Sequence, residues 1–152
     1  MDERERVLVT LAGMRALMGA IWLSLLVGKL PPHFGRADRN GFMHTFQLAR
    51  QHAFTGPLRG LVHRLVIPHF TLFAWIVFLL ELLTGLLLLT GFYTRVGAWL
   101  GLMLSLAIAL FLGGSPHSWR FALVLLVAWH VVLLATPCAR RLSLDDRLGR
   151  DP

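Results

Sequence analysis

Residues 67–91 read IPHFTLFAWIVFLLELLTGLLLLTG, an apolar run with a single carboxylate, Glu81, near its middle. At helical rise such a run extends roughly 37 Å, enough to cross a hydrocarbon core of about 30 Å with some tilt. A carboxylate at that depth costs a few kcal/mol unless it is protonated, paired or facing water. The sequence therefore predicts a membrane-spanning helix and, elsewhere in the chain, a partner for Glu81.

The composition is typical of an integral membrane protein, because 56% of the 152 residues are hydrophobic and only 15% are charged. A chain of this length predicts one domain. The net charge of +7 comes from arginines that lie mainly between the apolar runs, where they suit lipid headgroups, and neither a basic stripe nor a recognition motif indicates nucleic acid. The single cysteine, Cys138, excludes an internal disulfide and a cysteine metal site.

Three further apolar runs, residues 7–30, 96–112 and 119–136, are also predicted to span the membrane. The short connections at residues 91–95 and 113–116 contain glycine, and they make successive spans antiparallel neighbours. We therefore predict an all-α integral membrane protein: one antiparallel four-transmembrane-helix bundle, followed by a polar tail at residues 138–152. Small residues that recur every fourth position in the first span predict close helix packing there. They are Ala12, Ala16, Ala20, Ser24 and Gly28.

The connection between the first two spans, residues 31–65, is too polar to cross a membrane. Asn40 can cap an amphipathic helix that runs to Phe54, and a second amphipathic segment covers residues 58–65. Such helices are typical of the membrane interface. The connection also carries histidines whose spacing matches no metal signature, which favours solvated or interfacial side chains over metal ligands. They are His33, His44, His52 and His63, with His69 just beyond.

Three ionisable residues fall inside the predicted spans: Arg15, Glu81 and His130. Helical rise, counted from the side of the termini, places them at depths of about 12, 15 and 9 Å, so the three could form one polar layer. We therefore predict that Arg15 and Glu81 pair and that His130 faces the same interior. Two structural alternatives remain open: the pair serves only to fix helix register, and His130 is a neutral residue bonded to a hydroxyl or carbonyl.

The stretch from Glu81 to Arg95 resembles the DoxX family of DoxX/DoxD-like small four-helix membrane proteins. The features that carry this resemblance are an acid, a glycine four residues later, an apolar run, a second glycine and then Thr-Arg. These are Glu81, Gly85, Gly91, Thr94 and Arg95. The resemblance extends to residues 15–19 and Lys29 in the first span and to residues 142–145 in the tail.

The resemblance implies a membrane partner in redox work, because the family includes the small subunit of a thiosulfate:quinone oxidoreductase. It leaves open whether the chain itself catalyses a reaction. The first hypothesis is a quinone-associated subunit in which Arg15 and His130 donate hydrogen bonds to quinone carbonyls and Glu81 moves the proton. The second is a non-catalytic accessory or anchoring subunit of a larger membrane complex. The third is a small-solute or proton transporter.

No cofactor-binding motif is visible in the sequence, so a quinone dissolved in the bilayer is the one cofactor considered. The expected partners are the lipid bilayer and other protein subunits. Charge does not determine orientation, because seven basic residues other than Arg15 flank the spans on each side. The resemblance favours a bacterial inner membrane protein with cytoplasmic termini.

Overall fold

The computed structural model describes residues 2–39, 41–114 and 119–136, and every regular element in these ranges is a helix. This confirms the all-α prediction. In chain order the elements are α1 (Glu3–Ser24), α2 (Phe42–His52), α3 (Gly56–Leu61), the π-helix η1 (Val62–Val66), α4 (Phe70–Thr90), α5 (Thr94–Leu112) and α6 (Trp119–Ala135). The predicted polar tail at residues 138–152 lies outside the described residues.

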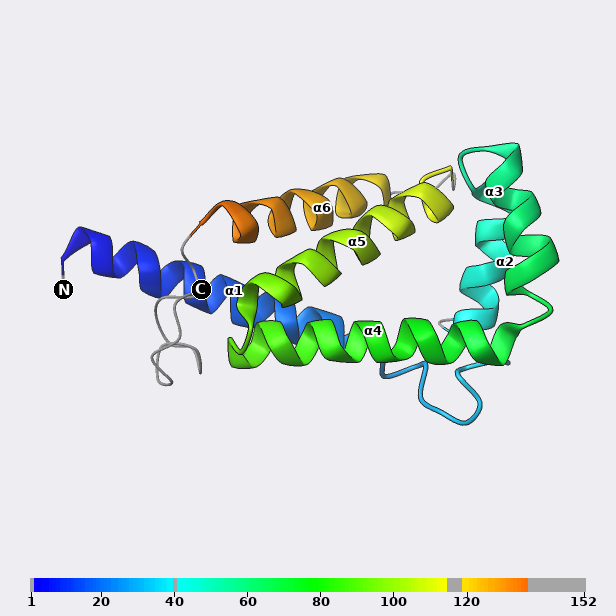
Figure 1. The fold of residues 1–152 in the computed structure, drawn as a ribbon, viewed down its shortest axis with the longest axis horizontal. Coiled ribbons are helices and arrows are strands. Elements are labelled where there is room, and N and C mark those ends of the chain that lie inside the picture. Colours follow the sequence, from blue (N-terminus) through cyan, green and yellow to red (C-terminus); the bar gives the residue numbers. More distant parts are fainter. Residues whose placement is uncertain (1, 40, 115–118, 137–152) are drawn as a thin grey trace.

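The four longest helices, α1, α4, α5 and α6, run in alternating directions (Figure 1), with α1 packed on α4, α4 on α5 and α5 on α6. Three of them contain segments long and apolar enough to cross a membrane: Glu5–Ser24, Phe70–Thr90 and Thr94–Leu112. The apolar part of α6, Phe121–Ala135, is shorter. Length and composition therefore support three spans directly.

The first span is shorter than predicted, because α1 ends at Ser24 and not at Leu30. The backbone tightens after that point, where the N–H groups of Leu26 and Lys29 donate to carbonyls three residues earlier. The loop that follows, residues 25–41, then packs on the first half of α4. Its buried Leu26 and Phe34 join Phe42 of α2 and Phe70, Ala74 and Phe78 of α4 in one cluster. Hydrophobicity alone could not distinguish this buried loop from a continuing helix.

Helices α1 and α4 approach each other closely at two glycines, Gly19 and Gly85. A Cβ added at Gly19 would lie 2.8 Å from the carbonyl oxygen of Gly85 and would overlap the backbone of Leu89. The predicted strip of small residues is only partly used, since Ala12 is buried but Ala20 and Ser24 are exposed. The helices therefore meet along a neighbouring face of α1.

Gly19→Val is expected to destabilise the protein, because the added side chain must separate two backbones that are already in contact. Overpacking of this kind typically costs about 1–3 kcal/mol. The matched control is Gly13→Ala on the same helix, where an added Cβ meets nothing within 4 Å. Alanine there should be neutral or slightly stabilising through its helix propensity. Thermal unfolding of both variants in detergent is the measurement, and equal midpoints would contradict this packing.

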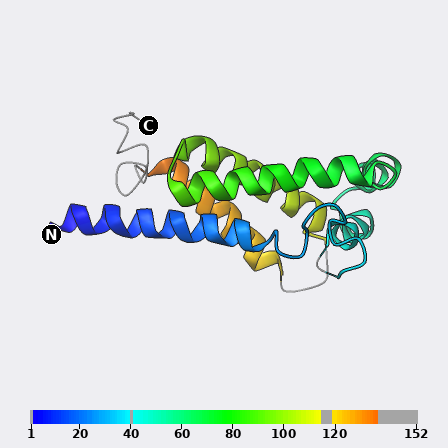
Figure 2. The same cartoon turned by 90° about the horizontal axis from the view of Figure 1, so that it is seen from below.

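The polar connection folds into a cap, which we define as α2, α3 and η1, residues 42–66. The cap crosses the end of the bundle that lies opposite the start of α1 (Figure 1), and its helices are seen nearly end on when α1 and α4 run across the view (Figure 2). The helix predicted for residues 40–54 is confirmed as α2, with Gly41 at its N-cap position, while Asn40 is outside the described residues. In the second amphipathic segment, residues 58–65, Val62 is buried, and so is Val66 just beyond it, at the end of η1.

Candidate functional site

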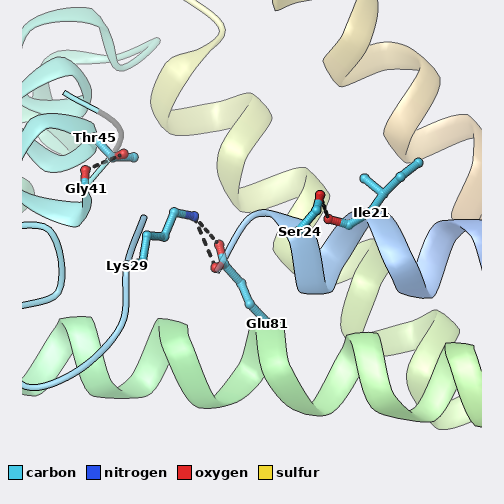
Figure 3. Close-up of polar contacts among 6 residues, drawn as sticks. All are labelled: Ile21, Ser24, Lys29, Gly41, Thr45 and Glu81. Carbon is cyan, nitrogen blue, oxygen red and sulfur yellow. Dashed lines mark hydrogen bonds and ion pairs between the residues drawn. The ribbon is translucent and has the colours of Figure 1, made fainter. Parts of the chain in front are cut away.

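The carboxylate of Glu81 forms an ion pair with Lys29 (Figure 3). The Lys29 ammonium donates to both carboxylate oxygens, at 3.0 Å to Oε1 and 3.1 Å to Oε2. Only 3% of the Glu81 side chain and 12% of the Lys29 side chain are exposed. Glu81 is therefore paired within the protein, as its position in an apolar helix requires.

The loop of residues 25–41 holds Lys29 in place through backbone hydrogen bonds. The N–H of Lys29 donates to the carbonyl of Leu26 at 2.8 Å, and the N–H of Phe34 donates to the carbonyl of Leu30 at 2.9 Å. Phe34 also accepts a bond from the N–H of Phe42 at 3.1 Å, which ties the loop to the first residue of α2. Lys29 is thus positioned by a connection with several internal backbone hydrogen bonds, as irregular backbone inside a membrane protein requires.

One aromatic ring, that of Phe42, contacts the ion pair and belongs to a larger aromatic cluster. The Lys29 ammonium lies 4.8 Å from the centroid of the Phe42 ring, within the range of a cation–π interaction. The Phe34 ring lies 5.1 Å from the Trp75 ring and 6.2 Å from the Phe78 ring, in edge-to-face geometry. Because both charged side chains are largely buried, their electrostatic interaction is stronger than it would be in water.

Arg15 is buried but does not pair with Glu81, so the predicted ion pair between them is wrong. Its Nη1 donates to the hydroxyl of Thr94, at 3.4 Å, near the start of α5. Leu23 of α1 lies against Gly85 of α4. Glu81 lies one turn before Gly85 along α4, and Arg15 lies two turns before Leu23 along α1. Because the two helices are antiparallel, these offsets point in opposite directions and add. Arg15 and Glu81 are therefore separated by roughly three helical turns, or about 16 Å.

The error arose from the assumed register of the two helices. The depth estimate placed Val7 and Gly91 at the same membrane surface. The structure instead brings Arg15 to the level of Thr94, so that α1 is displaced by about two turns and projects beyond the end of α4 (Figure 1). A shift of this size cannot be seen in either hydrophobic pattern taken alone.

His130 is completely buried and both of its ring nitrogens have protein partners. The indole N–H of Trp22 donates to Nε2 at 3.1 Å, and Nδ1 lies 2.8 Å from the carbonyl oxygen of Leu126. Because Nε2 accepts, the proton belongs on Nδ1, which describes a neutral imidazole. The hydroxyl of Ser105 lies 3.4 Å from Nδ1, and a Cβ at Gly101 would overlap the ring.

The predicted single polar layer is thus three separate levels along the bundle. Arg15 with Thr94 lies near the middle of α1, His130 meets α1 two turns later at Trp22, and Glu81 pairs with Lys29 beyond the end of α1. The residue that the sequence analysis did not connect with Glu81 is Lys29. One feature of the sequence sets this residue apart, because Lys29 is the sole lysine in a chain with 14 arginines.

Trp22→Phe is expected to destabilise the fold through His130. The substitution keeps an aromatic ring but removes the N–H donor and leaves Nε2 of a buried histidine without that bond. An unsatisfied buried acceptor costs about 1–3 kcal/mol. Chemical unfolding in detergent should show this loss, and it should largely disappear in a His130→Phe background, where no acceptor remains. A full loss in that background would show that Trp22 acts through packing alone.

Comparison with known protein families identifies the chain's family. The sequence model of the family described as "TQO small subunit DoxD" matches residues 11–151, which include Arg15, Lys29, Glu81 and His130. Searches of the curated proteins and of the solved structures return no match. A match over nearly the whole chain shows the family, so the protein belongs to the DoxD family of TQO small subunits.

Proposed function

We propose that the chain is a membrane subunit of a quinone-linked oxidoreductase complex, and that Glu81 and Lys29 form its proton-handling site beside a quinone. Membership of a family described as the TQO small subunit supports a subunit role. The observation that supports the site is the buried ion pair itself, with Lys29 and Glu81 3.0 Å apart and the Lys29 ammonium over the Phe42 ring. Buried ionisable residues in membrane spans commonly mark such sites.

The chemistry of the buried pair suits a quinone headgroup. Phe34 and Phe42 are buried, so a quinone ring would approach from the side of Trp75, which is 41% exposed and whose ring lies 5.1 Å from that of Phe34. When bound, a quinone would supply the two-electron redox chemistry for which the described residues offer no centre of their own. The Lys29 ammonium would donate a hydrogen bond to its carbonyl oxygen, and the Glu81 carboxyl would take up or deliver the accompanying proton.

Arg15 and His130 are less suited to bind a quinone next to Glu81 than the sequence predicted. Arg15 lies on another level of the bundle, and the ring nitrogens of His130 are already bonded to Trp22 and Leu126. Quinone contacts by these two residues stay predictions. Their geometry instead favours the structural alternative, in which they secure helix packing.

The proposal includes a complete antiparallel bundle of four spans in the bacterial inner membrane. Helix α6 has 17 residues, at the lower limit for a span, and its direction alternates with that of α5 (Figure 1). The cap would then lie in the interface opposite the termini, and the termini would be cytoplasmic. Cysteine labelling at an engineered terminal position tests the orientation, and labelling only from the periplasmic side would reverse it.

Native purification tests the function. The tagged full-length protein should co-purify with other subunits of a membrane complex, and organic extraction of that complex should release a quinone in stoichiometric amount. Lys29→Met/Glu81→Gln, which keeps the pair's shape without charge, should retain the subunits but lose most of the quinone. A wild-type complex that assembles without quinone would instead favour the accessory or anchoring role.

A further inference from the structure

The outer face of the cap, together with the preceding loop, is strongly cationic. Residues 30–69 contain five arginines and a single acid, Asp38. All five arginine side chains are exposed, and within the part of the chain that the structure describes no acidic side chain pairs with them. They are Arg36, Arg39, Arg50, Arg59 and Arg64. The cap therefore presents charge that the described residues do not neutralise.

The cap also exposes large apolar side chains. Phe54, Leu61 and Leu65 are exposed on the cap, although Val62 and Val66 beside them are buried. Leu61 and Arg64 are three residues apart in a helical segment, so that a leucine and a guanidinium lie next to each other on one side. A surface in contact with water alone would not favour the leucines, and one in the hydrocarbon core would not favour the arginines. The mixture matches the boundary between headgroups and acyl chains.

The position of the cap agrees with that boundary. Its helices cross the end of the bundle where α1 has ended and α4 begins (Figures 1 and 2). Leu72 and Trp75, in the first two turns of α4, are exposed on the side of the helix and mark where the apolar surface starts. In a bilayer that surrounds the bundle, the exposed arginines of the cap would therefore lie close to the headgroup phosphates.

We propose that the cap is a binding surface for anionic phospholipid headgroups. The guanidinium groups of Arg50 and Arg64 are the phosphate ligands, because neither is engaged by a protein acceptor among the described residues. Arg59 is not assigned to phosphate, because its Nε already donates to the carbonyl of Ala53 at 2.8 Å and links α3 to the end of α2. Phe54, Leu61 and Leu65 contact the upper acyl chains. This surface is independent of the ion pair proposed above as the proton site.

Lipid titration of the full-length protein in detergent, read by native mass spectrometry, tests the proposal. Phosphatidylglycerol should bind in preference to phosphatidylcholine, and Arg50→Gln/Arg64→Gln should weaken phosphatidylglycerol binding by roughly tenfold or more. The matched control is Arg6→Gln/Arg95→Gln, which removes the same charge from exposed positions away from the cap and should have a much smaller effect. Arg50→Lys/Arg64→Lys should retain most of the preference.

Three outcomes would overturn the proposal. The first is equal binding of phosphatidylglycerol and phosphatidylcholine by the wild type. The second is an equal loss of phosphatidylglycerol binding in Arg50→Gln/Arg64→Gln and in the control Arg6→Gln/Arg95→Gln. The third is that Arg50→Gln/Arg64→Gln loses an acidic partner protein while it keeps its lipid preference. The last result would show that the cap binds a partner protein and not a phospholipid. If Arg50→Gln/Arg64→Gln does not fold, the wild-type protein alone still tests the proposal, because added salt should release phosphatidylglycerol from an electrostatic binding surface. Retention at high salt would contradict it.

Discussion

Lys29→Met is expected to destabilise the folded protein by about 3–5 kcal/mol, because it leaves the carboxylate of Glu81 buried without its countercharge. Methionine retains much of the length and volume of the lysine stem, so the loss reports the missing charge more than missing packing. The cation–π contact with Phe42 disappears as well. Chemical unfolding of the purified variant in detergent, followed by circular dichroism, measures the change.

A double-mutant cycle separates the ion pair from its parts. Lys29→Met/Glu81→Gln removes both charges and leaves no unpaired ion, so it should be considerably more stable than Lys29→Met alone, even though it carries more substitutions. Glu81→Gln alone should also be destabilising, because a largely buried ammonium group over the Phe42 ring then lacks its carboxylate. If the two single effects simply add in the double variant, the 3.0 Å contact contributes no coupling energy and the pair has no structural role.

The fold was largely predictable from hydrophobic periodicity. The runs around Glu81 and after Arg95 became α4 and α5 within a few residues of their predicted bounds, because long apolar segments specify their own secondary structure. The amphipathic pattern of residues 42–52 likewise sufficed to place α2. The end of α1 could not be placed, because Leu25, Leu26 and Val27 are as apolar as a helix would require, yet they belong to a turn.

The site was less predictable, because it depends on the register between two helices and on a loop. The sequence identified Glu81 as a residue that needs a partner, and the structure supplies Lys29, which approaches from the loop of residues 25–41 and not from a span. Arg15 was the natural choice by depth, but the contact of Gly19 with Gly85 fixes α1 in another position. Those contacts are tertiary, and no periodicity within a single segment encodes them.

Glu81→Gln should lower quinone-linked turnover per assembled complex by about 10²-fold or more, if the carboxyl carries the proton as proposed. Glutamine matches glutamate in shape and can still accept a hydrogen bond from Lys29, but it cannot take up and release a proton near neutral pH. Turnover is measured on complexes isolated through a partner subunit and normalised to the amount of this chain they contain, so that weaker assembly does not enter the rate.

Two controls separate proton transfer from loss of structure. Trp22→Phe should weaken folding through His130 at a different level of the bundle, so its turnover per assembled complex should stay near that of the wild type. Lys29→Met/Glu81→Gln should assemble better than either single charge variant yet remain as inactive as Glu81→Gln, because neutralising the pair restores stability without restoring a proton carrier. Wild-type turnover in an assembled Glu81→Gln complex would exclude the proton role and leave the buried pair as a structural link between the loop and α4.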